Sequence, residues 1–187
     1  MTINQQQNST QSSDRIAELE AKVKRLEEIL LLVGDVYRFG RLQELLAAGK
    51  WREADQETIQ VILVITGQSE LEAISPNDVR QFPCDQLRVI DKLWTTYSKG
   101  HFGFSVQAKI YQEVGGSLST TIAQDNSMIE RLGDRVGWWV NNRWQKCDEL
   151  DYSLNAPEGC HPSRWWNSPF GSKMTNYFLA RVMTCEL

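Results

Sequence analysis

The chain has 187 residues, of which 41% are hydrophobic and 24% charged, and a formal net charge of −4 at pH 7. This composition supports a globular core, and its acidic balance argues against a nucleic-acid-binding surface. No apolar run is longer than the five residues from Val61 to Ile65, which is far short of the ~20 residues of a membrane-spanning helix. We therefore expect one principal domain with an appendage, no nucleic-acid partner and no membrane span.

The first residues and the cysteines bear on the cellular setting. Residues 1–13 are rich in Gln, Asn, Ser and Thr, which predicts a disordered tail, and they lack the basic and apolar regions of a signal peptide. The four cysteines are widely spaced and form no C-x-x-C pair of the kind that marks zinc or redox sites; they are Cys84, Cys147, Cys160 and Cys185. Free thiols in a reducing cytoplasm are the simplest expectation.

Residues 14–34 have the pattern of a short coiled-coil helix. Asp14 can cap its start, and Gly34 can end it. Apolar residues between them recur with a period of 3.5 and are flanked by charges; they are Ile16, Leu19, Val23, Leu26, Leu30 and Val33. Under three heptads is short for an autonomous coiled coil. Two interpretations stay open, namely self-association and docking of this helix on its own domain.

Residues 35–187 predict a mostly helical domain. Helical faces ended by Gly49 and Gly67 indicate two antiparallel helices joined at Gly49-Lys50. Ser75, followed by proline and then an acid three residues on, predicts the start of a third helix. Further helices are expected over 85–97, from Ser105 to Val114, and over 174–183, with a loop at 117–127. Residues 138–145 predict a small hairpin that turns at Asn141-Asn142.

The usual signatures of catalysis are missing from the sequence. It contains no glycine-rich phosphate loop, and its two histidines leave little room for a metal site or a proton relay. We therefore expect neither an enzyme nor a metal centre.

The aromatic residues are the most informative feature. Of the 18, 15 lie between Phe82 and Phe178, and several stand in turns rather than on periodic faces. Examples are the rings around Gly103, those after Gly137, and those between Pro162 and Pro169. Such rings predict a concave apolar surface for a flat partner. The alternative is that loops fold over the rings and bury them.

Residues 155–172 strengthen this hypothesis because long irregular loops in compact domains are often binding loops or lids. Arg164 precedes Trp165-Trp166, so a guanidinium can pair a ligand carboxylate while the rings cover the ligand's apolar body. Each charge-assisted contact would contribute about 1.5–3 kcal/mol. Burying ~200–300 Å² of ligand would contribute about 5–8 kcal/mol before association costs. The pattern predicts a large, planar, carboxylated hydrophobe as ligand.

Four segments, at 45–55, 82–94, 97–107 and 133–138, resemble the motifs of the genomes-uncoupled-four family in order. The resemblance covers about residues 42–187. It implies a mostly α fold, in which a compact helical domain has a cupped apolar face and at most one small β-hairpin, here preceded by the short coiled-coil helix. In that family the apolar palm is covered by a loop between the last two helices.

The resemblance also implies a function, namely noncovalent binding of protoporphyrin IX or magnesium-protoporphyrin IX and stimulation of magnesium chelatase through its large subunit. The implied ligand-binding residues are Phe82, Leu87, Trp94, Phe102, Phe104, Trp138, Trp144, Arg164 and Trp165. A bilin is the alternative ligand, and a protein-interaction module that has lost pigment binding is the alternative function. The expected location is the cytoplasm, and the alternative is a peripheral position at photosynthetic membranes.

Two departures from the family's motifs fall on the presumed ligand side. Cys160-His161 stands where the loop usually has histidine and leucine, and Trp139 replaces a common basic residue. A thiolate beside an imidazole can add to a bilin vinyl group. The alternative interpretation is a free thiol that packs within the loop.

Overall fold

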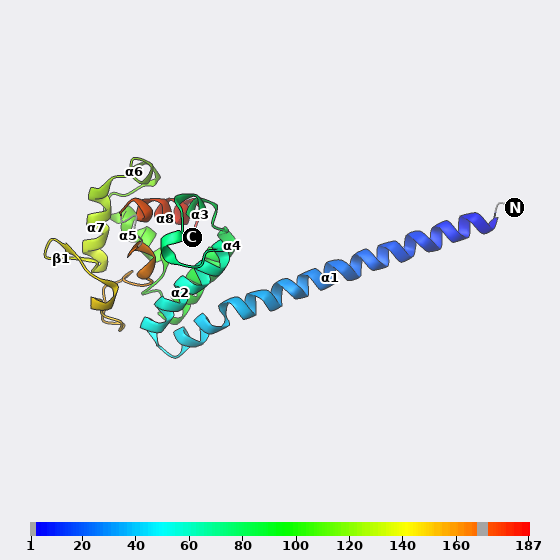
Figure 1. The fold of residues 1–187 in the computed structure, drawn as a ribbon, viewed down its shortest axis with the longest axis horizontal. Coiled ribbons are helices and arrows are strands. Elements are labelled where there is room, and N and C mark those ends of the chain that lie inside the picture. The colour runs from blue at the N-terminus through cyan, green and yellow to red at the C-terminus, as the bar shows by residue number, and fades with distance from the viewer. Residues whose placement is uncertain (1–2, 168–171) are drawn as a thin grey trace. The chain divides into compact units, whose positions relative to one another are not determined.

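The computed structural model describes the backbone of residues 3–167 and 172–187 (Figure 1). They fall into two compact units, one ending at Gly40 and the other spanning Arg41–Leu187. The described chain is mostly helical, with a single two-stranded hairpin in that part, which confirms the predicted fold class. Over the described residues, no helix combines the length and apolar character needed to cross a membrane.

Helix α1 (Ile3–Ala47) differs from the expected N-terminal segment. Residues 3–13, predicted to be disordered, are helical, and the helix passes through Gly34 instead of ending there. Extending a formed helix costs far less than nucleating one, and a glycine within it costs only about 1 kcal/mol relative to alanine. These penalties are too small to end a helix that continues on both sides.

The second unit contains the end of α1, then seven further α-helices, three short 3₁₀ helices and the hairpin in the described residues. They are α2 (Trp51–Thr66), η1 (Leu71–Ala73), α3 (Pro76–Gln81), α4 (Cys84–Tyr97), α5 (Phe104–Glu113), α6 (Leu118–Ile122), α7 (Asn126–Val136), β1 (Trp139–Val140), β2 (Arg143–Trp144), η2 (Cys147–Glu149), η3 (Arg164–Asn167) and α8 (Ser172–Thr184). The C-terminal α8 contacts α3, α5, α6 and α7 (Figure 1). It is therefore central to this unit.

Several predicted helix ends and turns are confirmed. Gly49 and Gly67 adopt φ of +66° and +69°, which a glycine tolerates best. The Ser75 hydroxyl accepts from the Asp78 amide at 3.2 Å, and the Asp78 carboxylate accepts from the Ser75 amide at 2.8 Å. The hairpin pairs Trp139 with Trp144 around the predicted Asn-Asn turn.

Other local predictions are wrong. Helix α5 begins at Phe104, and Ser105 instead donates to the Asp91 carboxylate through its amide at 2.8 Å. The expected loop at 117–127 contains α6, capped by Ser117 through its bond with the Thr120 amide. Helix α7 was not predicted, although its buried face (Ile129, Leu132 and Val136) has helical spacing. These short helices are stabilised by caps and by packing rather than by propensity.

The expectation of four free thiols is also wrong. Cys84 and Cys185 form a disulfide, with their Cα atoms 5.3 Å apart and a sequence separation of 101. Cys147 and Cys160 are free and buried. Sequence spacing could not reveal the disulfide, because only the packing of α8 brings Cys185 to the first residue of α4.

Candidate functional site

An apolar groove lies between α2, η1, α3, η3 and α8. The residues that line this apolar groove are Ile59, Ile62, Thr66, Leu71, Ile74, Val79, Phe82, Trp165, Met174 and Phe178. Apart from the Thr66 hydroxyl and the Trp165 indole N–H, these side chains are apolar. Helix α2 contributes Ile59, Ile62 and Thr66 to the lining, because their spacing of three and four residues places them on one face of the helix. The remaining space is about 20 Å³, room for about one water molecule.

Two stacked rings form part of the groove wall. Trp165 of η3 and Phe178 of α8 lie 4.2 Å apart between centroids, with their planes 27° apart. The Trp165 indole donates to the Pro162 carbonyl at 3.0 Å, which fixes its orientation. Phe104 and Trp138 contact it edge-on, at 6.3 and 5.9 Å between centroids. The wall is therefore supported from behind by further rings.

A second, more polar groove adjoins the first. It has a volume of about 240 Å³ and is lined by Gln56, Ile59, Gln60, Leu71, Cys147 and Arg164. Ile59 and Leu71 line both spaces, so the two grooves meet at these side chains. An apolar surface and a cationic, amide-bearing surface are thus contiguous.

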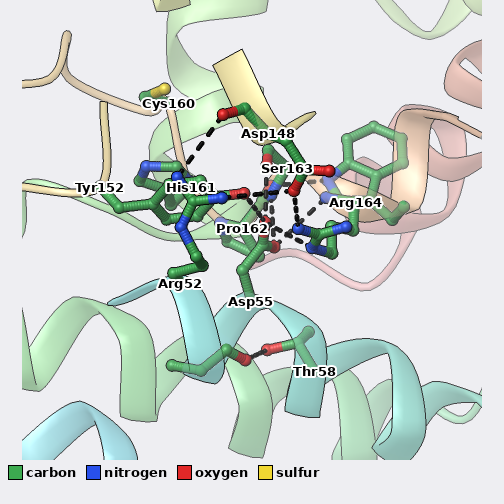
Figure 2. Close-up of polar contacts among 12 residues, drawn as sticks. Arg52, Asp55, Thr58, Asp148, Tyr152, Cys160, His161, Pro162, Ser163 and Arg164 are labelled. Atoms are coloured by element: carbon green, nitrogen blue, oxygen red, sulfur yellow. Dashed lines mark hydrogen bonds and ion pairs between the residues drawn. The ribbon is translucent and has the colours of Figure 1, made fainter. Parts of the chain in front are cut away.

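A buried carboxylate ties the irregular segment before α8 to helix α2 (Figure 2). Asp55 of α2 is fully buried. It accepts hydrogen bonds from the Ser163 amide and hydroxyl at 2.7 and 2.6 Å. The Arg164 amide at 3.2 Å and the Tyr152 hydroxyl at 3.0 Å complete its set of donors. These bonds offset the desolvation of the charge and position η3 against the groove.

The Arg164 side chain already has carboxylate partners. Its Nη2 donates to Asp148 at 2.7 Å, and its Nε lies 3.8 Å from Asp55. Asp148 also pairs with Arg52 at 3.3 Å, and the Arg52 guanidinium lies 4.4 Å from the centroid of the Tyr152 ring (Figure 2). Asp148 is 75% exposed, and its hydrogen bond with Arg164 lowers the pKa of its carboxyl group. A ligand carboxylate that reaches Arg164 would therefore compete with Asp148.

Comparison with known proteins bears on this arrangement. The family model described as GUN4-like matches residues 34–179. The chain belongs to the GUN4-like family. Its structure matches the ligand-free structure of Arabidopsis thaliana GUN4 with a TM-score of 0.60 and 27% identity over 76% of this chain and 94% of that chain. A GUN4 structure from Chlamydomonas reinhardtii, at 22% identity and a TM-score of 0.56, has the same fold over 75% of this chain and 86% of that chain.

Curated relatives of this GUN4-like chain are longer. A Ycf53-like protein of Synechocystis is 28% identical over 124 residues, or 65% of this chain and 48% of the relative. The Tetrapyrrole-binding protein, chloroplastic, of Arabidopsis thaliana is 36% identical over 86 residues, or 41% of this chain and 29% of the relative. The chain thus spans about half the length, or less, of the curated relatives that it matches.

The structure divides the predicted binding residues of this family among several places. Phe82 and Trp165 line the apolar groove, and Phe104 and Trp138 support it from behind. The others lie elsewhere. Leu87, Trp94 and Phe102 are fully buried in the core, and Trp144 packs edge-on against Trp139 on the hairpin.

The prediction that these side chains form an open hollow is wrong. Seven of the nine are only 0–4% exposed. The rings in glycine turns are enclosed by neighbours that come from distant segments; Phe102, for example, contacts Trp51, Trp94 and His161. Whether any of the nine contacts a ligand stays a prediction.

The predicted cover, residues 155–172, is only partly described, because residues 168–171 lie outside the described residues. Ala156 and residues 159–163 are buried, so this part of the segment belongs to the core instead of forming an exposed lid. The aliphatic groove residues Ile62, Ile74 and Val79 were not predicted as site residues. Their signal was the apolar stripe of α2 together with the capped start of α3.

Cys160 and His161 do not form a reactive pair in the structure. Cys160 is 1% exposed, and burial raises the pKa of its thiol to about 12, so the thiol is protonated at neutral pH. The Nε2 of His161 is 2.8 Å from the Asp151 carbonyl, and its ring stacks on Tyr152 at 4.4 Å. The interpretation of a free thiol packed in the loop therefore fits better than covalent attachment. Among the described residues, no group of three His, Cys, Asp or Glu side chains can hold a metal.

The buried imidazole of His161 predicts a pH dependence of stability. Burial lowers its pKa in the folded state below the usual 6.5, so the unfolded chain binds a proton first as pH falls. Stability should be unaffected by this group above pH ~6.5. Below it, the free energy of unfolding should fall by up to about 1.4 kcal/mol per pH unit until the folded-state pKa is reached. Urea unfolding at pH 7.5, 6.5 and 5.5 measures this slope.

A matched pair of variants assigns the slope to its source. His161→Gln should flatten it between pH 6.5 and 5.5, whereas His101→Gln should retain it. Equal slopes in the wild type and in His161→Gln would contradict the assignment.

Proposed function

We propose that this protein binds a porphyrin-type tetrapyrrole noncovalently and acts as a regulatory binding protein rather than an enzyme. The observation that carries this proposal is the apolar groove, which meets the Arg164-lined groove at Ile59 and Leu71. A porphyrin combines a planar apolar ring with carboxylates along one edge. Its ring suits the first groove, and its carboxylates suit the second. Membership in the GUN4-like family supports the same ligand class.

Binding requires the apolar groove to open, because about 20 Å³ cannot hold a macrocycle. We expect the opening to separate Trp165 from Phe178, since their stacked rings join η3 to α8 across the wall. Losing one such ring contact costs about 0.5–1.5 kcal/mol. Burying ~200–300 Å² of pigment contributes about 5–8 kcal/mol, so the ligand's apolar burial outweighs this cost.

Absorbance and tryptophan-fluorescence titrations test the proposal. The full chain is titrated in parallel with protoporphyrin IX, its magnesium form and phycocyanobilin. We expect saturable quenching and a shifted Soret band with at least one porphyrin. Tighter binding of the bilin would identify a bilin instead of a porphyrin as the ligand. The absence of a saturable change with all three compounds would overturn the proposal.

The exposed carboxylate of Asp148 provides a separate prediction. Asp148→Asn should remove the competitor for Arg164 and lower the dissociation constant for protoporphyrin about three- to tenfold. Because Asp148 is 75% exposed, the free energy of unfolding should be nearly unchanged. A fluorescence titration measures the affinity, with Asp134→Asn on α7 as control. An unchanged constant would show that the pigment carboxylates do not reach Arg164.

The small volume of the groove favours a second candidate, a protein-interaction module that keeps the fold without binding pigment. In that case α2, η1 and α8 would form a closed core, and no tetrapyrrole would quench the tryptophans. The titrations above distinguish the two candidates directly.

We further propose that the pigment-bound protein stimulates magnesium chelatase through its large subunit, in the cytoplasm or at the periphery of photosynthetic membranes. The family resemblance supports this partner. Reconstituted chelatase should insert magnesium faster when the protein and protoporphyrin are both added. An unchanged rate, with pigment binding intact, would reject the partner but not the ligand.

A further inference from the structure

An exposed apolar stripe runs along part of α1 within the N-terminal unit. Ile16, Leu19, Val23 and Leu26 are 54, 53, 53 and 65% exposed, although all four are large and aliphatic. Their spacings of three, four and three residues place them on one face of the helix. Exposing such a seam to water is unfavourable, and burying it against another helix lowers the free energy.

The residue types along this seam favour one kind of pairing. In heptad notation, Ile16 and Val23 occupy the a positions, and Leu19 and Leu26 occupy the d positions. β-branched residues at a with leucine at d favour a parallel, two-stranded coiled coil over larger bundles. The apolar seam continues at residues 30 and 33, but there leucine is at a and valine at d, so this preference rests on the first two heptads.

The charges beside the seam favour one relative orientation of the two helices and one kind of partner helix. Arg15 and Lys22 occupy the g positions, and Glu20 and Glu27 occupy the e positions. In a parallel, in-register pair, each g residue faces the e residue five positions later in the other chain. Arg15 then meets Glu20 of the second copy, and Lys22 meets Glu27. In an antiparallel pair g faces g and e faces e, so that like charges meet.

We propose that residues 15–33 form a parallel, in-register, two-stranded coiled coil with the same segment of a second copy of this chain. The segment is complementary to itself in both shape and charge, which is the property that a homodimer seam requires. Its length of under three heptads makes the association concentration-dependent. Both chains leave the coiled coil at its C-terminal end, so each dimer carries two GUN4-like domains.

Sedimentation equilibrium of the full chain over a wide concentration range tests the association. The wild type should show a reversible monomer–dimer equilibrium. Glu20→Lys combined with Glu27→Lys makes every e–g contact repulsive and should weaken dimerisation about tenfold or more. Asp14→Lys combined with Glu28→Lys adds the same charge at outward f positions and should change the constant by less than about threefold.

A mixing experiment adds a gain-of-function test. Arg15→Glu combined with Lys22→Glu should dimerise as poorly as Glu20→Lys combined with Glu27→Lys. An equimolar mixture of the two double variants should restore the dimer, because each g–e contact then joins opposite charges. A wild type that stays monomeric at all concentrations, or a mixture that stays monomeric, would overturn the proposal.

Cysteine crosslinking determines the orientation. Leu19→Cys and Leu26→Cys, tested separately, should each give a disulfide-linked dimer under mild oxidation, since identical d positions are adjacent only in a parallel, in-register pair. Ala17→Cys, at a b position, should not. The two free cysteines of the wild type are buried, so its background crosslinking should be low. Crosslinking at only one of the d positions would indicate an antiparallel or shifted pair and reject the proposed register.

Discussion

Replacing Leu71 with aspartate is expected to weaken porphyrin binding about 100-fold. Leu71 lines both grooves at the point where they meet, and its side chain is only partly buried. The protein can therefore fold with a solvated carboxylate there. Covering that carboxylate with a macrocycle would cost about 3 kcal/mol in desolvation, which corresponds to a factor of about 100 in the dissociation constant.

A matched control separates this effect from a general loss of apolar surface. Leu154→Asp alters a leucine that is 51% exposed and outside both grooves. It should leave the tryptophan-quenching titration unchanged within about twofold. Equal affinities for Leu71→Asp and the wild type would place the pigment elsewhere on the domain, or show that the protein binds none.

Replacing Asp55 with alanine is expected to lower the free energy of unfolding by about 3–5 kcal/mol. The substitution removes a fully buried acceptor and leaves four donors without it, namely the Ser163 amide and hydroxyl, the Arg164 amide and the Tyr152 hydroxyl. Loss of one partner from a buried, charge-assisted network has a cost of this size. The melting temperature should fall by about 10 °C.

Urea unfolding measures the change, and Asp148→Asn is the control because it alters a carboxylate of the same cluster that is exposed to solvent. The control should unfold at nearly the same urea concentration as the wild type. If Asp55→Ala proved equally mild, the carboxylate would not be what holds the segment before α8 against α2.

Local patterns in the sequence were sufficient to predict the mostly helical class and many local features. The Ser75 capping box, the glycine turns after α1 and α2, and the Asn-Asn hairpin were all predictable. Each depends on a few neighbouring residues whose backbone preferences act locally. The ordered motifs between residues 45 and 138 were sufficient to indicate the family.

Which side chains are buried could not be predicted in this way, because burial depends on how distant segments pack together. Phe102 and Trp138 stand beside glycines in turns and are nevertheless fully buried, because burial depends on segments distant in sequence. The same holds for the Cys84–Cys185 disulfide and for the carboxylates that surround Arg164. The apolar groove combines aliphatic residues of α2, η1 and α3 with rings of η3 and α8. Local periodicity predicts which face of each helix is apolar, but only packing determines where those faces leave a space.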